Sequence, residues 1–350
     1  MSNAVRDRVD SALRDFMLDA TRHLRDLGDE LVPVAEIASE FVLSGGKRLR
    51  PSFCYWGGIA AGAEDSEALI HAAASLELLQ ACALVHDDVI DHSDTRRGRP
   101  AVHERFTSLH RRSGWSGDAG DFGTAAAILL GDLLLAWSDA MLAASGLHDG
   151  ALRRARSVSA PMRTEVMAGQ YLDIVEQAQG ATTVERALRV ARLKSAKYTV
   201  ERPLHLGAAI ANGGADVFAA FTDYGIPLGE AFQLRDDLLG VFGDPVTTGK
   251  PAGDDLREGK QTVLLALALE RTGPADRDFL VGVVGRTDLG DEDIAHAQQV
   301  ITRCGARGEV EAMIAARLPD AVRALGNVAL EPSGRDALEG LANAASYRHG

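Results

Sequence analysis

The feature that most constrains this chain is a group of aspartates at the end of an apolar segment. Asp87, Asp88 and Asp91 follow residues 72–86, which are rich in Ala and Leu and contain neither Gly nor Pro, so we expect a helix over 72–90. Residues four apart share one face of a helix, so Asp87 and Asp91 point into the same space. Two carboxylates in one space repel each other unless a cation lies between them, and Mg2+ prefers oxygen ligands. The motif therefore predicts a magnesium site at the end of this helix.

Two arginines follow the aspartates directly. Arg96 and Arg97 would provide the positive charge that holds phosphate oxygens. A solvated acidic helix end is the alternative interpretation of such a motif taken alone. It is disfavoured here because the motif ends an apolar helix, runs into the double arginine and has a counterpart far downstream.

The counterpart ends a second predicted helix, over residues 215–242. Asp236 and Asp237 lie near its end, and Lys250 and Lys260 follow at short distance. Two helices that each present carboxylates inward, with basic residues between them, can surround a diphosphate bridged by several Mg2+ ions. Two unrelated surface acid pairs would not explain why basic residues follow each of them.

A third charged stretch begins where residues 44–46 (Ser-Gly-Gly) end a predicted helix over 31–43. Lys47, Arg48 and Arg50 follow, so two glycines and three basic residues stand together. Such a stretch is a candidate anion site, since its backbone N–H groups are available as well. A basic helix start on the surface is the alternative, and the residues alone leave both interpretations open.

The composition limits the classes of partner. Acidic residues (50) outnumber basic residues (37), and the formal net charge of −13 argues against an extended nucleic-acid-binding face. Three scattered cysteines without metal-binding spacing are typical of reduced core thiols in a cytoplasmic protein (Cys54, Cys82 and Cys304). No charged and apolar leader opens the chain. The most apolar segment, residues 124–142, contains Asp132 and Asp139, so no transmembrane segment is expected.

Helical periodicity runs through the sequence, and alternating β-branched segments are nearly absent. The pattern predicts helices over residues 5–27, 31–43, 51–63, 72–90, 101–109, 122–145, 152–179, 184–211, 215–242, 261–271, 275–284, 291–318, 321–329 and 333–347. Residues 111–123 and 243–255 are predicted to be loops, the first of them flexible, because they are rich in Gly, Ser, Asp or Pro. No linker divides the chain, so we expect one all-α domain over residues 1–350, a single large helical bundle.

These motifs, in this order, resemble those of the trans-type isoprenyl diphosphate synthases, the polyprenyl synthetase family. The resemblance is carried by the two aspartate motifs and by four shorter ones, which are residues 45–51 (Gly-Gly-Lys-Arg-Leu-Arg-Pro), 169–173 (Gly-Gln-Tyr-Leu-Asp), Lys194-Ser195 and Phe232-Gln233. It implies an all-α bundle of the isoprenoid synthase type with a central active-site cavity. It also implies several Mg2+ ions in each site, about three by analogy with the family, and a homodimer.

The resemblance further implies roles for individual residues. The catalytic residues would be Asp87, Asp88, Asp91, Lys194, Asp236 and Asp237, of which Asp87, Asp91 and Asp236 would bind Mg2+. The diphosphate of the allylic substrate would be held by Arg96, Lys194, Lys250 and Lys260, with Ser195 and Gln233 nearby. Isopentenyl diphosphate would be held by Gly46, Lys47, Arg50 and Arg97, and the cavity would be lined by Gln170 and Asp173.

Two positions depart from the family's pattern. Gln80 stands where many members carry a histidine that contacts isopentenyl diphosphate. Its amide can still donate a hydrogen bond to this substrate, so we expect an altered KM rather than loss of function. Gly240 replaces the third aspartate of the second motif. Asp236 and Asp237 remain and Asp244 lies close in the sequence, so we expect metal binding to survive with one carboxylate fewer.

The length of the product would depend on the helix that leads into Asp87, along which the growing chain would run. One isoprene unit is about as long as one helical turn (~5.4 Å). Cys82 and Ala83, one turn away, are small, and Leu79 lies two turns away. Family members that stop at fifteen carbons commonly carry an aromatic residue near position 82 or 83. We therefore favour geranylgeranyl diphosphate, with twenty carbons, over a longer chain or farnesyl diphosphate.

Two other functions use similar features. A class I terpene cyclase also carries an aspartate motif on an α-bundle, but it handles one diphosphate and would not need the basic stretch at 46–50. A non-catalytic subunit that modulates an active synthase would typically have lost an aspartate motif. Here the first motif is whole and the second lacks only its third aspartate. The favoured interpretation is therefore a prenyltransferase that condenses isopentenyl diphosphate with an allylic diphosphate.

Overall fold

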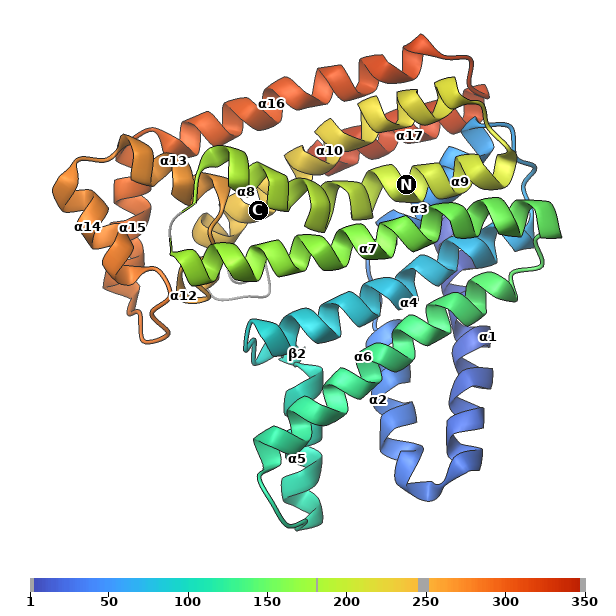
Figure 1. The fold of residues 1–350 in the computed structure, drawn as a ribbon, viewed down its shortest axis with the longest axis horizontal. Helices are drawn as coiled ribbons and strands as arrows, with labels where there is room; N and C mark the ends of the chain where they lie inside the picture. Colours follow the sequence, from blue (N-terminus) through green and yellow to red (C-terminus); the bar gives the residue numbers. More distant parts are fainter. Residues whose placement is uncertain (1–2, 181, 245–251, 347–350) are drawn as a thin grey trace.

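The computed structural model describes residues 3–180, 182–244 and 252–346, which are almost entirely helical (Figure 1). The α-helices are α1 (Asn3–Leu27), α2 (Val32–Leu43), α3 (Leu49–Ala60), α4 (Glu67–Ile90), α5 (Val102–Ser113), α6 (Ala119–Ala143), α7 (Asp149–Gln179), α8 (Val184–Ala191), α9 (Arg202–Ala211), α10 (Ala215–Phe242), α12 (Asp254–Arg257), α13 (Val263–Arg271), α14 (Pro274–Val283), α15 (Asp291–Arg303), α16 (Ala306–Ala324) and α17 (Pro332–Ser346). The remaining elements are the 3-10 helices η1 (Asp29–Leu31) and η3 (Leu325–Asn327), the π-helix η2 (Arg192–Glu201) and a two-stranded hairpin of β1 (Thr95–Arg96) and β2 (Arg99–Pro100).

α4 is the central helix of the largest hydrophobic cluster. Its N-terminus is capped by Ser66, whose Oγ accepts a hydrogen bond from the backbone N–H of Leu69 at 3.3 Å. Buried residues then occur all around the helix rather than along one stripe, and α4 packs against α1, α3 and α6. Because the helix is covered on several sides, the aspartates at its end lie within the protein.

The other long helices lie side by side in a fixed order. η2 lies between α7 and α10, and α10 packs in turn against α16 (Figure 1). A second hydrophobic cluster joins α10 to α13, α14, α15 and α16 at one end of the molecule. A third cluster joins α3, α9, α10 and α17. The ends of α4 and α10, where the two aspartate motifs lie, are thereby held by different parts of the core.

Two glycines let η2 approach its neighbours closely. A Cβ atom at Gly169 of α7 would lie 2.5 Å from the backbone N of Lys194, and one at Gly229 of α10 would lie 2.5 Å from the Cα of Ala196. Real Cβ atoms do not come this close to backbone atoms, so neither position has room for a side chain. A π-helix is rare and occurs mostly as a short segment at functional sites. Here it holds the backbone of Lys194 between α7 and α10.

The predicted fold class is confirmed, since the described chain is α-helical apart from one short hairpin. The helix predicted over 215–242 is α10 with the same bounds, and α4 begins five residues before the predicted residue 72 because Ser66 provides its cap. The helix predicted over 184–211 is wrong as one α-helix, because η2 separates α8 from α9. That the chain is a single domain stays a prediction.

The loop predicted over residues 111–123 is mostly helical. α5 continues to Ser113 and α6 begins at Ala119, so only residues 114–118 connect them. Asp118 caps α6 by accepting a hydrogen bond from the Asp121 N–H at 2.9 Å. The rings of His110, Trp115 and Phe122 pack together across this connection, with centroids 5.2 to 5.9 Å apart. The expected flexible insertion is therefore a short packed turn.

Other boundaries also differ from the predicted ones. The helix predicted over 291–318 breaks at Gly305, whose φ of 81° belongs to the left-handed region. α16 then continues through Pro319 to Ala324, into the separate helix predicted over 321–329. The loop predicted over 243–255 contains the start of α12, and its residues 245–251 lie outside the described residues.

Two helices are long and apolar enough to cross a membrane by length and composition alone. They are α4 and α6. α6 includes residues 124–142, which were not expected to span a membrane because they contain Asp132 and Asp139. In α4, 72% of the most apolar window is buried inside the protein, as in the core helix of a soluble protein. In α6 only 39% of that window is buried, so this helix presents a largely uncovered apolar face.

The contact between α7 and η2 can be tested by adding one methyl group. We expect Gly169→Ala to destabilise the protein by about 1–3 kcal/mol, because its Cβ would overlap the backbone of η2. The matched control is Gly340→Ala, at a helical glycine whose Cβ would meet nothing within 4 Å, and which should stabilise by about 0.5–1 kcal/mol. Urea unfolding followed by circular dichroism measures both. Equal effects of the two substitutions would show that the close contact does not constrain η2.

Candidate active site

The carboxylates of the first motif face one space, in which two lysines lie. Lys194 Nζ of η2 donates a hydrogen bond to Asp87 Oδ1 at 3.1 Å and another to Asp173 Oδ2 of α7 at 2.7 Å. Lys260 Nζ lies 3.4 Å from Asp91 Oδ2. Asp87 and Asp91 are also linked by a backbone hydrogen bond of 2.8 Å at the last turn of α4. The structure thus brings together residues that are more than a hundred positions apart in the sequence.

The electrostatics of this pair differ between its two members. Burial by itself would raise the pKa of Asp87, but Lys194, Lys260 and Arg96 lower it to about 2. Burial and the charge of Asp87 raise the pKa of Asp91 to about 6, although Lys260 opposes this. For Lys194, burial would lower the pKa, yet Asp87 and Asp173 raise it to about 12. Two like charges therefore share one space that the lysines neutralise only in part.

The chemistry of Asp91 fits a hard cation. Its carboxylate is almost completely buried, with 2% of the side chain exposed. Among the residues that the structure describes, no donor makes a hydrogen bond to either of its oxygens. Buried carboxylates normally have such partners. Oxygen ligands of this kind are those that Mg2+ prefers, so the residues present fit a magnesium site that includes Asp91 and Asp87.

Asp88 holds an arginine beside the site. Its side chain is fully buried, and Oδ1 accepts a hydrogen bond from Arg96 Nε at 2.7 Å as well as a shorter contact from the second guanidinium nitrogen. Arg96 also lies 3.5 Å from Asp87 Oδ2. Asp88 was expected among the catalytic residues, and its contacts are those of a residue that positions Arg96.

The hairpin after α4 directs the two arginines to different places. Its turn consists of Arg97 and Gly98, both with positive φ (54° and 70°), as a two-residue hairpin turn requires. While Arg96 reaches the aspartates, the Arg97 guanidinium donates to the backbone oxygen of Gly45 at 2.8 Å and to Ser44 Oγ at 3.4 Å. Arg97 thus connects the first motif to the Gly-Gly-Lys stretch that follows α2.

The basic stretch after α2 divides into an inner and an outer part. Arg48 is buried, donating to Asp10 Oδ1 at 2.8 Å and to Glu77 Oε2 at 2.7 Å, so its charge is neutralised within the core. Arg50 donates to Thr199 Oγ1 at 2.8 Å, and its guanidinium lies 4.4 Å from the centre of the Tyr198 ring.

A concentration of positive charge surrounds this stretch. Next to the buried Arg48 in the chain, Lys47 is exposed and Gly46 is half-buried. Burial and the nearby charges of Arg48 and Arg96 lower the pKa of Arg97, although Glu77 opposes the shift. Positive charge that lowers the pKa of Arg97 in this way also favours an anion beside it. The fold therefore brings the basic residues of this stretch together with Arg97, and that they bind an anion stays a prediction.

The second motif lies at the end of α10 and meets the first through Lys260. Asp237 is buried and accepts a hydrogen bond from Gln233 Nε2 at 2.8 Å; burial and the charge of Asp255 raise its pKa to about 8. Lys260 Nζ lies 3.8 Å from Asp255 Oδ1 of α12, besides its contact with Asp91. Burial would lower the pKa of Lys260, but Asp255 and its other acidic neighbours raise it well above its usual value.

One group at this junction, Glu258, was not predicted from the sequence. Glu258 Oε2 lies 2.5 Å from Lys260 Nζ, and Glu258 Oε1 accepts a hydrogen bond from Ser93 Oγ at 2.9 Å. Glu258 therefore ties the segment after α12 to the turn after α4. Tyr198, which packs under Arg50, was missed as well. Their only sequence signal is closeness to Lys260 and Lys194, which is too weak to single them out.

The remaining predicted residues occupy varied positions. Ser195 is buried on η2, Asp236 and Gln80 are half-buried, and Gln170 Nε2 is buried without a hydrogen-bond partner among the described residues. Leu79 and Cys82 are buried in α4 and Ala83 is half-buried. Cys82 Sγ lies 3.8 Å from His86 Nδ1, and burial together with Asp132 raises the pKa of its thiol to about 12. Lys250 lies outside the described residues.

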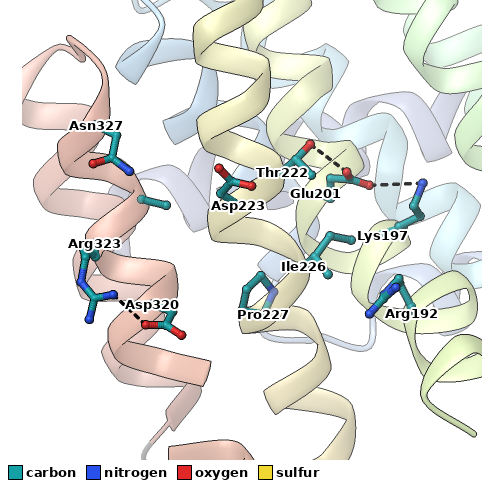
Figure 2. A pocket seen from close by; sticks show the side chains of 11 residues that line it. Arg192, Lys197, Glu201, Thr222, Asp223, Ile226, Pro227, Asp320, Arg323 and Asn327 are labelled. Atoms are coloured by element: carbon teal, nitrogen blue, oxygen red, sulfur yellow. Dashed lines mark hydrogen bonds and ion pairs between the residues drawn. The ribbon is translucent and has the colours of Figure 1, made fainter. Parts of the chain in front are cut away.

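A cavity of about 620 Å³ lies apart from these groups, between η2, α10 and the end of α16 (Figure 2). Two pairs of charged side chains line it: Arg323 donates to Asp320 at 2.9 Å, and Lys197 Nζ lies 3.7 Å from Glu201 Oε2. Thr222 donates to Glu201 at 2.9 Å. The residues that line it include no aspartate of either motif. The described residues that are expected to bind phosphate and metal therefore lie outside this cavity.

Comparison with known proteins places the chain in a family. The model of the polyprenyl synthetase family matches residues 32–301. A geranylgeranyl pyrophosphate synthase from Corynebacterium glutamicum, solved in complex with isoprenyl diphosphate and magnesium, has a TM-score of 0.95 and 44% identity over 99% of both chains. A geranylgeranyl diphosphate synthase of Mycobacterium tuberculosis is 34% identical over 82% of this chain and 79% of its own length. A (2E,6E)-farnesyl diphosphate synthase of Mycobacterium bovis is 33% identical over 74% of this chain and 67% of its own length.

These matches agree with the geometry of the site. Two acidic helix ends lie near two half-buried lysines, and a separate cluster of arginines lies beside them. The family match covers both aspartate motifs, the basic stretch after α2 and η2. The chain therefore belongs to the polyprenyl synthetase family and is a trans-prenyltransferase.

Proposed function

We propose that this protein condenses isopentenyl diphosphate with an allylic diphosphate, head to tail and with Mg2+, to make geranylgeranyl diphosphate. One observation carries the proposal: two half-buried lysines lie among the carboxylates of the first motif, and one of them, Lys260, also lies beside Asp255, which follows the second motif. Lys260 Nζ lies 3.4 Å from Asp91 of the first motif and 3.8 Å from Asp255 beside the second, and Lys194 Nζ lies 3.1 Å from Asp87. Acidic and basic groups thus alternate around one space, as a metal-bridged diphosphate requires.

The metal would be held by carboxylates of both motifs, with Asp87, Asp91 and Asp236 as its ligands. When bound there, Mg2+ would provide positive charge that stabilises the leaving diphosphate. Lys194, Lys260 and Arg96 would add to that charge as donors to the diphosphate oxygens. They are already held in place: Lys194 by Asp173, Lys260 by Glu258 and Arg96 by Asp88. Little reorganisation is needed when the substrate arrives.

The reaction itself needs few groups. The allylic carbon–oxygen bond breaks and its electron pair leaves with the diphosphate. The double bond of isopentenyl diphosphate then attacks the allylic cation, and a proton is lost from the resulting cation to the released diphosphate. Arg50, Arg97 and Lys47 would hold isopentenyl diphosphate beside the allylic substrate, since Arg97 reaches the stretch after α2 while its neighbour Arg96 reaches the aspartates. The protein's contribution is charge, orientation and the exclusion of water.

The product length is inferred from α4 and supported by the relatives. Cys82 and Ala83 are small, so no bulky side chain of these two positions blocks a chain that extends one turn beyond Asp87, and the first larger residue is the buried Leu79. Several relatives are geranylgeranyl diphosphate synthases, although others make farnesyl diphosphate. A twenty-carbon product fits both lines of support.

We also propose that the enzyme is a cytoplasmic homodimer. The support for the dimer is α6, of which 39% of the apolar window is buried while Leu129 is 69% and Ile128 43% exposed. A face of this kind is unfavourable in water, and a second copy of the same helix would cover it. The support for the cytoplasm is that Cys54, Cys82 and Cys304 are all free.

The proposed reaction can be tested by incubating the protein with Mg2+, radiolabelled isopentenyl diphosphate and one of dimethylallyl, geranyl or farnesyl diphosphate. The dephosphorylated products are then separated by chromatography. We expect one twenty-carbon alcohol, and none when EDTA replaces Mg2+. Longer alcohols, or a fifteen-carbon alcohol, would keep the reaction and refute the product length. No condensation with any of the three primers would favour a non-catalytic modulating subunit.

The course of the growing chain is tested at Cys82. We expect Cys82→Phe to shorten the product to fifteen carbons, because the ring would fill the first turn before Asp87. Cys82→Ala is the matched control, and it should leave the product length unchanged. Product analysis as above measures both, and circular dichroism shows whether each variant is folded. An unchanged product from a folded Cys82→Phe variant would show that the chain does not pass this residue.

The proposed dimer is tested on the exposed face of α6. We expect Leu129→Glu to convert the dimer to a monomer, since a buried unpaired carboxylate would cost several kcal/mol. Val281→Glu, at a residue of α14 that is 57% exposed, should leave the mass unchanged. Size-exclusion chromatography with light scattering measures the mass of each variant. If Leu129→Glu remains dimeric, the interface does not include this face of α6.

A further inference from the structure

The second aspartate motif ends at a glycine where the family's pattern has a third aspartate. Asp236 and Gly240 are four residues apart on α10, so a side chain at position 240 would share a face with Asp236. The sequence alone suggests that this site has lost one carboxylate. The structure shows what fills the space instead.

The carboxylate of Asp255 occupies the place of a side chain at position 240. A Cβ atom built on Gly240 would lie 2.0 Å from Asp255 Oδ2, 2.2 Å from its Cγ and 2.7 Å from Oδ1. The three nearest atoms all belong to this one carboxylate. Real Cβ atoms essentially never approach other atoms closer than 3.0 Å, so a residue larger than glycine at 240 would require the Asp255 carboxylate or the backbone of α10 to shift.

From this place Asp255 faces the first motif. Its Oδ1 lies 3.8 Å from Lys260 Nζ, and the same ammonium lies 3.4 Å from Asp91 Oδ2. Asp255 is 14% exposed, so it lies within the site and not on the surface. The lysine thus stands between a carboxylate of the first motif and the carboxylate that replaces the third aspartate of the second.

The condition of Asp91, on the other side of Lys260, indicates that a cation besides this lysine belongs in the space. The Asp91 side chain is buried, with only 2% of its surface exposed. Neither of its oxygens receives a hydrogen bond from the residues that the structure describes. A buried carboxylate in this condition retains its capacity to bind a cation. Asp244 was the other residue expected to compensate for the aspartate missing at position 240. It is exposed, and none of the three atoms nearest to a Cβ at position 240 belongs to it.

We propose that Asp255, from α12, supplies the third carboxylate of the second aspartate motif, and that position 240 is glycine because this carboxylate fills its space. The proposal rests on the proposed function, since it concerns the same metal and diphosphate site. The motif pattern alone would predict that aspartate at position 240 improves metal binding, and this proposal predicts the opposite. Restoring aspartate at position 240 should damage the site, because two carboxylates would compete for one space and repel each other.

The experiment is a cycle of variants assayed by metal binding, not by activity. The wild type, Gly240→Asp, Asp255→Gly and the double variant Gly240→Asp/Asp255→Gly are titrated with Mn2+ in the presence of inorganic pyrophosphate. Free Mn2+ is measured by electron paramagnetic resonance. We expect each single variant to bind Mn2+ about tenfold more weakly or worse. The double variant, in which the carboxylate moves from one residue to the other, should recover to within about threefold of the wild type.

Two further variants separate charge from folding. Asp255→Asn keeps the shape of the side chain and should lose affinity for Mn2+ like Asp255→Gly. Asp254→Asn, at the neighbouring residue of α12, should stay within about twofold of the wild type. Thermal unfolding without metal shows whether each variant is folded. These variants decide the question even if Gly240→Asp fails to fold, because Asp255→Asn introduces no overlap.

The outcomes distinguish this inference from the proposed function. If Gly240→Asp binds Mn2+ as well as the wild type or better, or if Asp255→Asn has no effect, Asp255 is not the third carboxylate and the proposed function stands. A double variant no better than either single variant likewise overturns the exchange of roles. A wild type that binds no Mn2+ with pyrophosphate overturns the proposed function and this inference together.

Discussion

The site depends on the pairing of largely buried carboxylates with two half-buried lysines. Carboxylates inside a helical bundle are strongly unfavourable unless cations and hydrogen bonds compensate for their burial. Lys194 serves Asp87 and Asp173, and Lys260 serves Asp91 and Asp255. Each lysine therefore links two helices that the chain places far apart, and the ends of those helices are fixed by charge as well as by packing.

This arrangement requires backbones to come unusually close. Lys194 reaches Asp87 because η2 lies directly against α7, and that contact is possible because Gly169 has no side chain. On the other side of the site, the turn of Arg97 and Gly98 sends one arginine to the aspartates and the next to the stretch after α2. The glycines of this protein thus have a functional consequence, because they set where the charges stand.

The sequence predicts well what local periodicity determines, and poorly what tertiary contacts determine. The face shared by Asp87 and Asp91 follows from helical spacing alone, and the all-α fold follows from the absence of strand patterns. The contact between Lys194 and Asp87 spans 107 residues, so no local pattern predicts it, and the family resemblance only assigned both residues to the same site. The π-helix and the break at Gly305 were missed because they depend on packing and on single φ angles, which residue patterns do not specify.

Gly240 shows where motif comparison fails for a physical reason. A motif records which positions carry a carboxylate, whereas a metal responds only to where the oxygens stand. Position 240 has no side chain, and the carboxylate of Asp255 occupies the space that this side chain would fill. Asp255 Oδ2 lies 2.0 Å from the place of a Cβ atom at residue 240. A departure from a motif therefore counts as a loss only after the vacated space has been found empty. In this chain the Asp255 carboxylate fills it, and the proposed role of Asp255 would keep the number of carboxylates around the site while changing their positions in the sequence.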